Sequence, residues 1–475
     1  MRITRKIIKN AFLDAETNIE FCWELLVDLK EFNIETDDWA NRLISFQDKL
    51  ATTIFNLQSI RDSILLEEKE YVKNKKKYKI EWFKSKLRLL ASFKDGIDKV
   101  VSLTKLLGDS YAYFFYQYDL ELLSEHLSHQ IVINHNAGIG ERGELEFIKK
   151  IKHIEGHFTL FHGITNILRY GDFSFINLKK LKVEKIGELK TSKVDEKTLS
   201  LSISILKRIE LEKETLPIKD SKLEETRRGR QILGIANFLR TKVTPNGISK
   251  DVINDSYSKE IETLIREAKL NKANYIQVSD GLAFICIKLK KTNLYNRIFK
   301  RRIDIIKQDD NVSSIAVEAA KKLMKPNSID NSLVINHLMG NADKSLYGTI
   351  PLFWQPIKCR FIKDIYFEDC HIVSLFNPIY LIEDIENMGF IIDSKYSNRN
   401  KVKKEKVVTK TIKRFDLFIP YITEYLLTEN FVFDCISAVE SHPLGNSSAE
   451  ITIKPQQRID ILNHKSNHRR RNKTT

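Results

Sequence analysis

Glycine and proline are missing from the start of the chain: the first glycine is Gly96 and the first proline is Pro217. These residues are the strongest helix breakers, so their absence favours long, uninterrupted helices in the N-terminal part. Apolar residues recur there at seven-residue intervals, the spacing of a helix-packing face, at Leu43, Leu50, Leu57, Ile64, Tyr71 and Tyr78. The core of a helical bundle and the seam of a helical dimer both fit this stripe, and the seam would make the protein a homo-oligomer.

Cysteine is also scarce, because the 475 residues contain five and none of them forms a C-x-x-C pair. This excludes zinc-knuckle and dithiol redox motifs, and scattered cysteines indicate a reducing compartment. No stretch reaches the ~18–20 apolar residues that a membrane-spanning helix needs. The basic N-terminus also lacks the apolar run of a signal peptide. We therefore expect a soluble, cytoplasmic protein without a membrane partner. A P-loop is absent too, so any ATPase activity would come from a partner protein.

The charge is strongly unbalanced, with 78 basic against 63 acidic residues and a formal net charge of +15. This favours a polyanionic partner, nucleic acid before an anionic membrane surface. One lysine-rich segment, residues 73–88, carries the aromatic residues Tyr78, Trp82 and Phe83 between its basic side chains. A phosphate-binding helix face with stacking aromatics and a solvated helix end fit this segment equally well.

The length predicts two or three domains. The texture of the sequence predicts an all-helical domain at 1–130, an α/β domain at 131–300, an α+β domain at 301–465 and a basic tail at 466–475. Extended segments are expected at 157–161, 167–176, 186–192 and 198–205, followed by a hairpin that turns at Asp280-Gly281. Residues 350–376 also suggest extended chain, with a turn near Glu368-Asp369.

Two of these segments carry residues suited to metal chemistry. Asp172 and Ser174 alternate with Phe173 and Phe175, while Glu188 and Lys190 share one face of the following strand. Two carboxylates hold a hard divalent cation through oxygen, and a neighbouring lysine orients water and stabilises developing negative charge. Paired as a hairpin, the two strands would suit metal-assisted hydrolysis of phosphodiesters.

The short motif alone does not single out this place. An acidic residue two positions before lysine also occurs at Asp28, Glu67, Asp195, Asp220, Glu267 and Asp393. Only the Glu188 motif lies on a strand-like segment that follows an Asp-led strand. A helix that contains Gly143-Glu144 precedes both.

In this order, Gly143-Glu144, Gly171-Asp172, Glu188-x-Lys190 and a later helix with Gln231 resemble the PD-(D/E)XK nuclease superfamily. The resemblance covers roughly residues 135–290 and implies a restriction-endonuclease-like core, a mixed sheet flanked by helices. It implies Asp172, Glu188 and Glu144 as ligands of Mg²⁺ or Mn²⁺, Lys190 as the water-positioning residue and Gln231 as a further site residue. Gly171 stands where the motif's name has proline, and Glu141 shares the helix face of Glu144 as an alternative.

The function expected from this resemblance is metal-dependent hydrolysis of phosphodiester bonds by a nuclease, in DNA before RNA, with restriction or anti-phage defence as a context that fits. Endonucleolytic and exonucleolytic cleavage both remain open. The basic residues that could bind phosphates are Arg227, Arg228 and Arg230 on the later helix and Lys179, Lys180 and Lys182 near the hairpin turn. A solvated basic surface fits these residues equally well. Two other functions remain open. One is a catalytically silent nucleic-acid binder on a nuclease fold, and the other is an oligomeric helical scaffold.

Overall fold

Long helices form where glycine and proline are missing. In the computed structural model, α1 spans Arg5–Lys30, α2 spans Trp39–Lys73 and α3 spans Ile80–Tyr116. The model describes residues 2–31, 39–117, 119, 122–123, 126, 143–144, 147–148, 153–154, 156–178, 182–193, 199–207, 256–270, 272–299, 309–326, 332–338, 351–392, 394, 396, 410–413, 415–417, 419–424, 426, 428–430, 432–433, 436 and 450–452.

The chain forms two units. Unit 1 contains Met1–Pro245 and Thr292–Phe299, and unit 2 contains Asn246–Lys291 and Lys300–Thr475. Unit 1 therefore includes both the helices expected for 1–130 and the sheet expected for the segment that follows.

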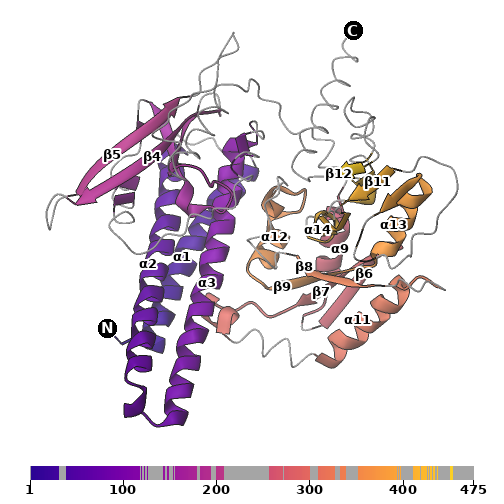
Figure 1. The fold of residues 1–475 in the computed structure, drawn as a ribbon, viewed down its shortest axis with the longest axis horizontal. Helices are drawn as coiled ribbons and strands as arrows, with labels where there is room; N and C mark the ends of the chain where they lie inside the picture. The colour runs from indigo at the N-terminus through magenta and orange to yellow at the C-terminus, as the bar shows by residue number, and fades with distance from the viewer. Residues whose placement is uncertain are drawn as a thin grey trace, which may run out of the picture. The chain divides into compact units, whose positions relative to one another are not determined.

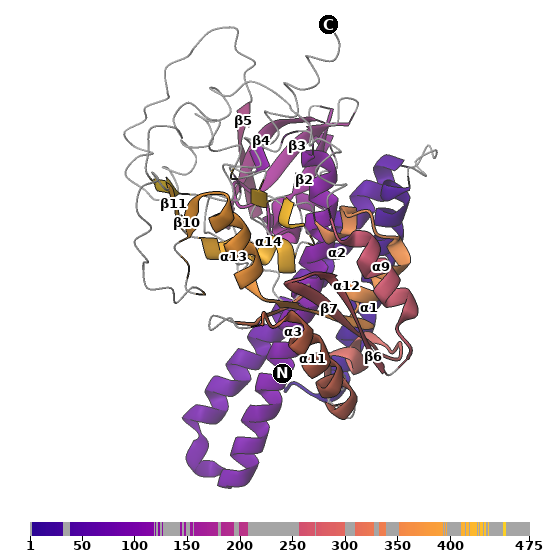
Figure 2. The same ribbon diagram turned by 90° about the vertical axis from the view of Figure 1, so that its right-hand side faces the viewer.

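Helices α1, α2 and α3 of unit 1 pack side by side as a bundle (Figure 1). The apolar residues that recur every seven positions along α2 form the core of this bundle. Leu43, Leu50 and Ile64 are fully buried, and Tyr71 is only 6% exposed. This confirms the stripe as the inside of a helical bundle within one chain. At 35 residues, α2 is ~50 Å long. Figure 2 shows the connected ends of α2 and α3 extending away from the sheet of the same unit.

A later segment, Thr292–Phe299, returns to this bundle. The ring of Phe299 stacks on Phe12 with centroids 5.6 Å apart, and the backbone N–H of Leu294 donates to Glu16 at 2.9 Å. Gly96 of α3 provides the space for the Phe299 ring, because a Cβ at position 96 would lie 2.6 Å from it. The segment thus completes the core of unit 1 from a distant part of the sequence.

The second layer of unit 1 is an antiparallel sheet in which strands adjacent in sequence are adjacent in space. Its strands are β1 (His153–Ile154), β2 (His157–Phe161), β3 (Phe173–Asn177), β4 (Lys182–Lys193) and β5 (Leu199–Lys207). The segments expected at 157–161, 186–192 and 198–205 form strands over their described residues, whereas the segment expected at 167–176 is a strand only from Phe173 onwards. The described strands of this sheet pair only in antiparallel fashion, so they do not include the parallel pairing of a mixed sheet.

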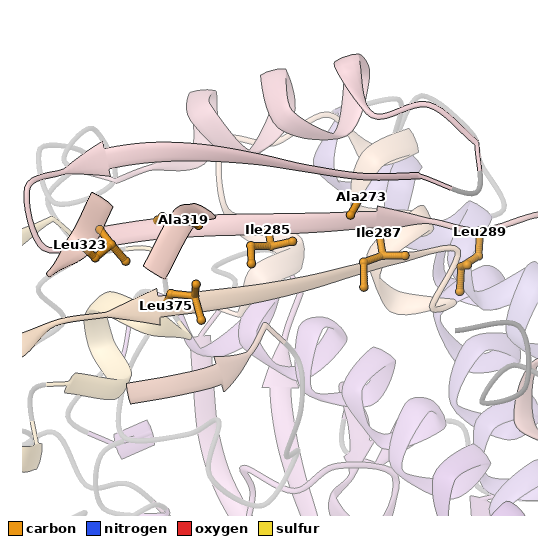
Figure 3. Packing of buried hydrophobic residues seen from close by; sticks show 8 residues of the cluster. Ala273, Ile285, Ile287, Leu289, Ala319, Leu323 and Leu375 are labelled. Atoms are coloured by element: carbon orange, nitrogen blue, oxygen red, sulfur yellow. The ribbon is translucent and has the colours of Figure 1, made fainter. Parts of the chain in front are cut away.

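Unit 2 is built on a second antiparallel sheet of order β6-β7-β9-β8, from β6 (Lys272–Ser279), β7 (Leu282–Lys288), β8 (Val334–His337) and β9 (Cys370–Phe376). Helix α11 (Asp309–Leu323) covers one face, where Ala319 and Leu323 pack against Ile285 and Leu375 (Figure 3). Alternate residues of β7 point the other way, and there Phe284 meets Tyr257 beside α9 (Ser258–Glu267). The hairpin predicted at Asp280-Gly281 joins β6 to β7.

The described part of unit 2 also contains the helices α12 (Cys359–Tyr366), α13 (Pro378–Asn387) and α14 (Ile419–Thr423). Two short 3-10 helices are η4 (Leu352–Trp354) and η5 (Phe415–Leu417). A small parallel sheet is formed by β10 (Phe390–Ile392), β11 (Lys410–Lys413) and β12 (Glu450–Thr452). Each of the two units thus contains both helices and β-sheet.

The expectation of extended chain across 350–376 is partly wrong, because α12 occupies its centre. Phe361, Ile362, Ile365 and Tyr366 are buried at spacings of one and four residues, which is a helical face. The aromatic and β-branched side chains of this segment are typical of strands, but the spacing of its buried residues is that of a helix. The strand after the turn is correct, and Glu368 in that turn has a positive φ of 54°.

Gly108 provides a test of how tightly the layers of unit 1 fit. A Cβ at this position of α3 would lie 1.9 Å from the backbone oxygen of Ile164. An exposed mid-helix Gly→Ala change normally stabilises by up to ~1 kcal/mol. Here we expect Gly108→Ala to destabilise unit 1 by ~1–3 kcal/mol, since backbone must move to admit the methyl group. Urea unfolding followed by circular dichroism measures the change.

Gly96→Ala is the matched control in the same helix. Its methyl group would meet the far end of the Phe299 ring, which moves more easily than backbone. We expect a smaller loss of stability. Equal or higher stability of Gly108→Ala relative to the wild type would contradict the packing described.

Candidate active site

Asp172 lies beside Glu188, immediately before β3 begins at Phe173. The backbone N–H of Asp172 donates to the oxygen of Gly187 at 2.8 Å, and the Asp172 carboxylate accepts from the N–H of Leu189 at 2.6 Å. Asp172 therefore binds both chain neighbours of Glu188. The two acidic residues are 9% and 7% exposed. The structure thus places Asp172 against the backbone on both sides of Glu188 and largely shields both acidic residues from water.

The backbone before Asp172 explains why this position is glycine. Gly171 has a φ of +61°, in the left-handed region, and a Cβ there would lie 2.8 Å from the oxygen of Gly187. Proline fixes φ near −65°, so it could not adopt this conformation. Gly171 directs the chain into the turn that places the Asp172 carboxylate over β4.

Neighbouring residues of β4 alternate between the two faces of the sheet. Ile186 pairs with Ser174, so Glu188 and Lys190 share the Ser174 face. Gly187, Leu189 and Thr191 occupy the other face. Glu188 is buried, whereas Lys190 is exposed and lies ~7 Å farther along the strand. The face thus runs from a buried carboxylate to an ammonium group that solvent and a ligand can reach.

Glu144 approaches β4 from the opposite face. A Cβ on its neighbour Gly143 would lie 2.1 Å from Thr191 Oγ1, and Phe147 packs on Phe173 with ring centroids 4.4 Å apart. Among the residues that the structure describes, which include Glu144, no three His, Cys, Asp or Glu side chains form a group able to hold a metal ion. Asp172, Glu188 and Glu144 therefore do not form a three-carboxylate group of this kind.

The other predicted site residues are distributed unevenly. Lys182 is half-buried where β4 begins, opposite Asn177. Gln231, Arg227, Arg228, Arg230, Lys179 and Lys180 lie outside the described residues, as does Glu141.

A buried chain of hydrogen bonds lies next to Asp172, centred on Ser174. The Ser174 hydroxyl lies 2.5 Å from both the Tyr116 hydroxyl and His162 Nε2, and the Tyr116 hydroxyl lies 3.2 Å from His126 Nε2. His126 Nδ1 accepts from the N–H of Tyr170 at 3.2 Å. The side chains of Tyr116, His126, His162 and Ser174 are fully enclosed.

The partners assign the direction of these bonds. His162 Nδ1 donates to the oxygen of Gly171 at 3.1 Å, so its Nε2 accepts from Ser174. His126 accepts through Nδ1, so its Nε2 donates to Tyr116, which then donates to Ser174. Both ends of the chain reach Tyr170 and Gly171, immediately before Asp172. The network therefore fixes the turn that presents the Asp172 carboxylate.

Burial sets the ionisation of this network. Loss of hydration lowers the pKa of His162 to about 3, against a smaller opposite effect of its bond to Gly171. Burial likewise raises the pKa of Tyr116 well above its usual value. Both side chains are thus neutral near pH 7, as the assigned hydrogen bonds require.

The helices hold the same loop at two further places. The Gln47 side chain donates to the oxygen of Thr159 at 2.8 Å and accepts from the N–H of Phe161 at 3.1 Å. Asp109 of α3 accepts from the N–H groups of Asn166 and Ile167, at 2.6 and 3.1 Å. Burial raises the pKa of Asp109 to about 6, although these hydrogen bonds oppose the rise. The α2 and α3 helices therefore position the strand and loop before Asp172.

Sequence reasoning missed this network. Tyr116 lies within a cluster of aromatic residues at 111–116, and no short spacing links it to His126 or His162 as a pattern. The available signal was Ser174, a hydroxyl in a strand whose described residues from Phe173 to Ile176 are otherwise apolar and buried. A buried hydroxyl requires partners, but the sequence does not name them.

In comparisons with known proteins, no family model, curated protein or solved structure matches the chain. None of the helices in the described part of the chain combines the length and apolarity needed to cross a bilayer.

The pH dependence of stability tests the buried ionisable groups. An unfolded histidine protonates near pH ~6.5, whereas native His162 stays neutral down to about pH 3. Below pH ~6.5 the unfolded chain therefore binds the extra proton, and stability falls by up to ~1.4 kcal/mol per pH unit. Asp109 acts in the opposite direction. Its native pKa of about 6 exceeds the unfolded ~3.9, so its contribution increases as the pH falls through 6.

Single substitutions should separate the two slopes. We expect His162→Gln to lose less stability than the wild type between pH 7 and 5, and Asp109→Asn to lose more. Urea unfolding at several pH values measures this, with the exposed His337→Gln as the control. The same pH slope in all four proteins would contradict the assigned ionisation states.

Proposed function

We propose that the chain is a metal-dependent nuclease that hydrolyses phosphodiester bonds, with DNA as its substrate. The observation that carries the proposal is the position of Asp172 beside Glu188, both buried and reached by one turn and one strand. Two carboxylates in low-dielectric surroundings repel one another unless a cation or a proton is shared between them. Hard oxygen ligands of this kind suit Mg²⁺ or Mn²⁺.

In this mechanism Asp172 and Glu188 would hold the ion. A bound Mg²⁺ supplies charge neutralisation and a lowered pKa of coordinated water. Lys190, exposed on the Glu188 face, donates a hydrogen bond that orients the attacking water. Its positive charge also stabilises the negative charge that develops on the phosphoryl oxygens as water adds and the P–O ester bond breaks. The Ser174 network keeps the Asp172 turn in place during the reaction.

The restriction-endonuclease-like core is part of the same proposal. A helix with Glu144, the Asp172 strand and the Glu188-x-Lys190 strand follow one another as the PD-(D/E)XK resemblance requires. A role in restriction or anti-phage defence is the biological context that this resemblance favours. Glu144 and Gln231 remain proposed site residues.

A catalytically silent nucleic-acid binder is the second candidate. The absence of a third metal-ligating side chain beside Asp172 and Glu188, among the described residues, is the observation that favours it. This candidate predicts DNA binding without cleavage in any divalent metal.

Cleavage by purified protein tests the proposal. We expect plasmid DNA to be nicked or cut in Mg²⁺ or Mn²⁺ and to remain intact in EDTA. Glu188→Gln, Asp172→Asn and Lys190→Ala should each reduce the rate by ~100-fold or more, because each removes an electrostatic contribution to the transition state. DNA binding should persist in these variants.

Glu184→Gln is the matched control, since Glu184 is a carboxylate on the same strand that binds His157 and Asn177 instead. It should cut DNA at nearly the wild-type rate. Undiminished cleavage by Glu188→Gln or Lys190→Ala would refute the assigned site.

A further inference from the structure

The turn between α2 and α3 concentrates positive charge at one end of unit 1. Its five lysines, Lys73, Lys75, Lys76, Lys77 and Lys79, are all exposed, and no acidic residue lies among them. The turn is ordered: Lys75–Lys77 form the 3-10 helix η1, and the N–H of Tyr78 donates to the oxygen of Lys75. Like charges held together in this way repel one another, and an anionic ligand would relieve that repulsion.

An aromatic platform lies beside these lysines. The rings of Tyr78 and Trp82 are stacked, with centroids 4.9 Å apart and planes inclined by 27°. Tyr71 supports both rings edge-on from below and is itself buried. Lys86 lies over the Tyr71 ring and pairs with Glu67 at 2.9 Å, which fixes the base of the platform. The platform is therefore rigid before any ligand binds.

Part of the platform is open to solvent. Trp82 is 46% exposed, and the neighbouring side chains of Val72 and Ile80 are 53% and 68% exposed. A lysine-rich turn alone is commonly only a solvated surface. An exposed, braced aromatic stack next to it adds a second requirement, for a ligand that offers both negative charge and a flat or apolar surface.

Nucleic acid meets both requirements, and two features favour it over an anionic membrane. The platform is a flat stack suited to a base, and basic side chains continue along α3 at the exposed residues Lys84 and Arg88, with the exposed carboxylate of Glu81 on the same helix. Such a line of charges suits an elongated polyanion better than a surface touched only at the tip. Gln47 binds the sheet, and Lys73 lies 26 residues farther along α2. This length of helix spans ~39 Å, close to one turn of duplex DNA.

We propose that this hairpin tip, residues 72–88, is a second nucleic-acid-binding surface. Its lysines bind the phosphate backbone, and the Tyr78–Trp82 stack receives an unpaired base. The choice of nucleic acid as partner rests on the proposed function, but the surface is separate from the Asp172–Glu188 pair. Its role is to hold the substrate at a distance from the cleaved bond.

Binding of labelled single-stranded and duplex 30-mers to the full-length protein, measured by fluorescence anisotropy in EDTA at several salt concentrations, tests this proposal. The tip variant replaces Lys73, Lys75, Lys76, Lys77 and Lys79 with Gln. We expect at least a 10-fold loss of affinity and a salt dependence (the slope of log K against log salt) lower by ~2–4, since each phosphate contact contributes ~0.7–0.9. Trp82→Ala should weaken single-strand binding more than duplex binding.

The matched control replaces five exposed lysines of unit 2 with Gln and so removes the same net charge: Lys259, Lys269, Lys272, Lys321 and Lys358. Its affinity should change less than threefold. Equal losses in the tip and control variants would overturn the proposal. So would tip-dependent binding to phosphatidylserine-containing vesicles with DNA affinity unchanged, which would make a membrane the partner.

The two proposals fail separately. Loss of tip-dependent binding leaves the cleavage test of Glu188 and Lys190 intact. Tip-dependent DNA binding without metal-dependent cleavage would support the tip and reject the nuclease.

Discussion

The hydrogen bonds at the buried Ser174 hydroxyl link the helices of unit 1 to the turn that carries Asp172. Tyr116 lies at the end of α3, and His162 follows β2. At one end of the network His162 donates to the oxygen of Gly171, and at the other the N–H of Tyr170 donates to His126. In a water-free interior, an unmet donor or acceptor is costly, so every member depends on the others. The position of the candidate metal ligand therefore depends on a network that holds the turn before it, at Tyr170 and Gly171.

This dependence explains why helices and sheet form one unit. Asp109 and Gln47 hold the same loop and strand from α3 and α2. Gly108 allows the backbones to approach. The long helices thus have two roles: their inner surface positions the site, and their connected ends carry a basic, aromatic surface far from it. A nuclease that holds its substrate at two places would use both.

The sequence predicted those features that depend on local periodicity. The heptad stripe of α2, the alternating strands β2 to β5 and the Asp280-Gly281 hairpin follow from side-chain spacing alone. The proximity of Asp172 to Glu188 in the fold follows from the expectation of a hairpin, because the strands β3 and β4 are consecutive. The segment around α12 was misjudged, since its aromatic and β-branched composition resembled a strand and the helical spacing of Phe361, Ile362 and Ile365 was overlooked.

Contacts between distant residues could not be predicted in this way. Tyr116 and Ser174 are 58 positions apart. Neither carries a spacing that identifies the other as its partner. The return of Phe299 to the bundle, and the side of β4 from which Glu144 approaches, likewise depend on tertiary packing. Sequence periodicity specifies which face of an element is buried, but not what covers it.

Direct measurement of metal binding tests the central claim most closely, that Asp172 and Glu188 form a divalent-cation site. Titration of Mn²⁺ into the full-length protein, followed by electron paramagnetic resonance, counts bound ions without requiring cleavage. The account predicts a bound Mn²⁺ that Mg²⁺ displaces and that is lost in both Asp172→Asn and Glu188→Gln, but retained in Glu184→Gln. Mn²⁺ binding that is unchanged in the double variant of Asp172 and Glu188, or no binding by the wild type, would contradict it.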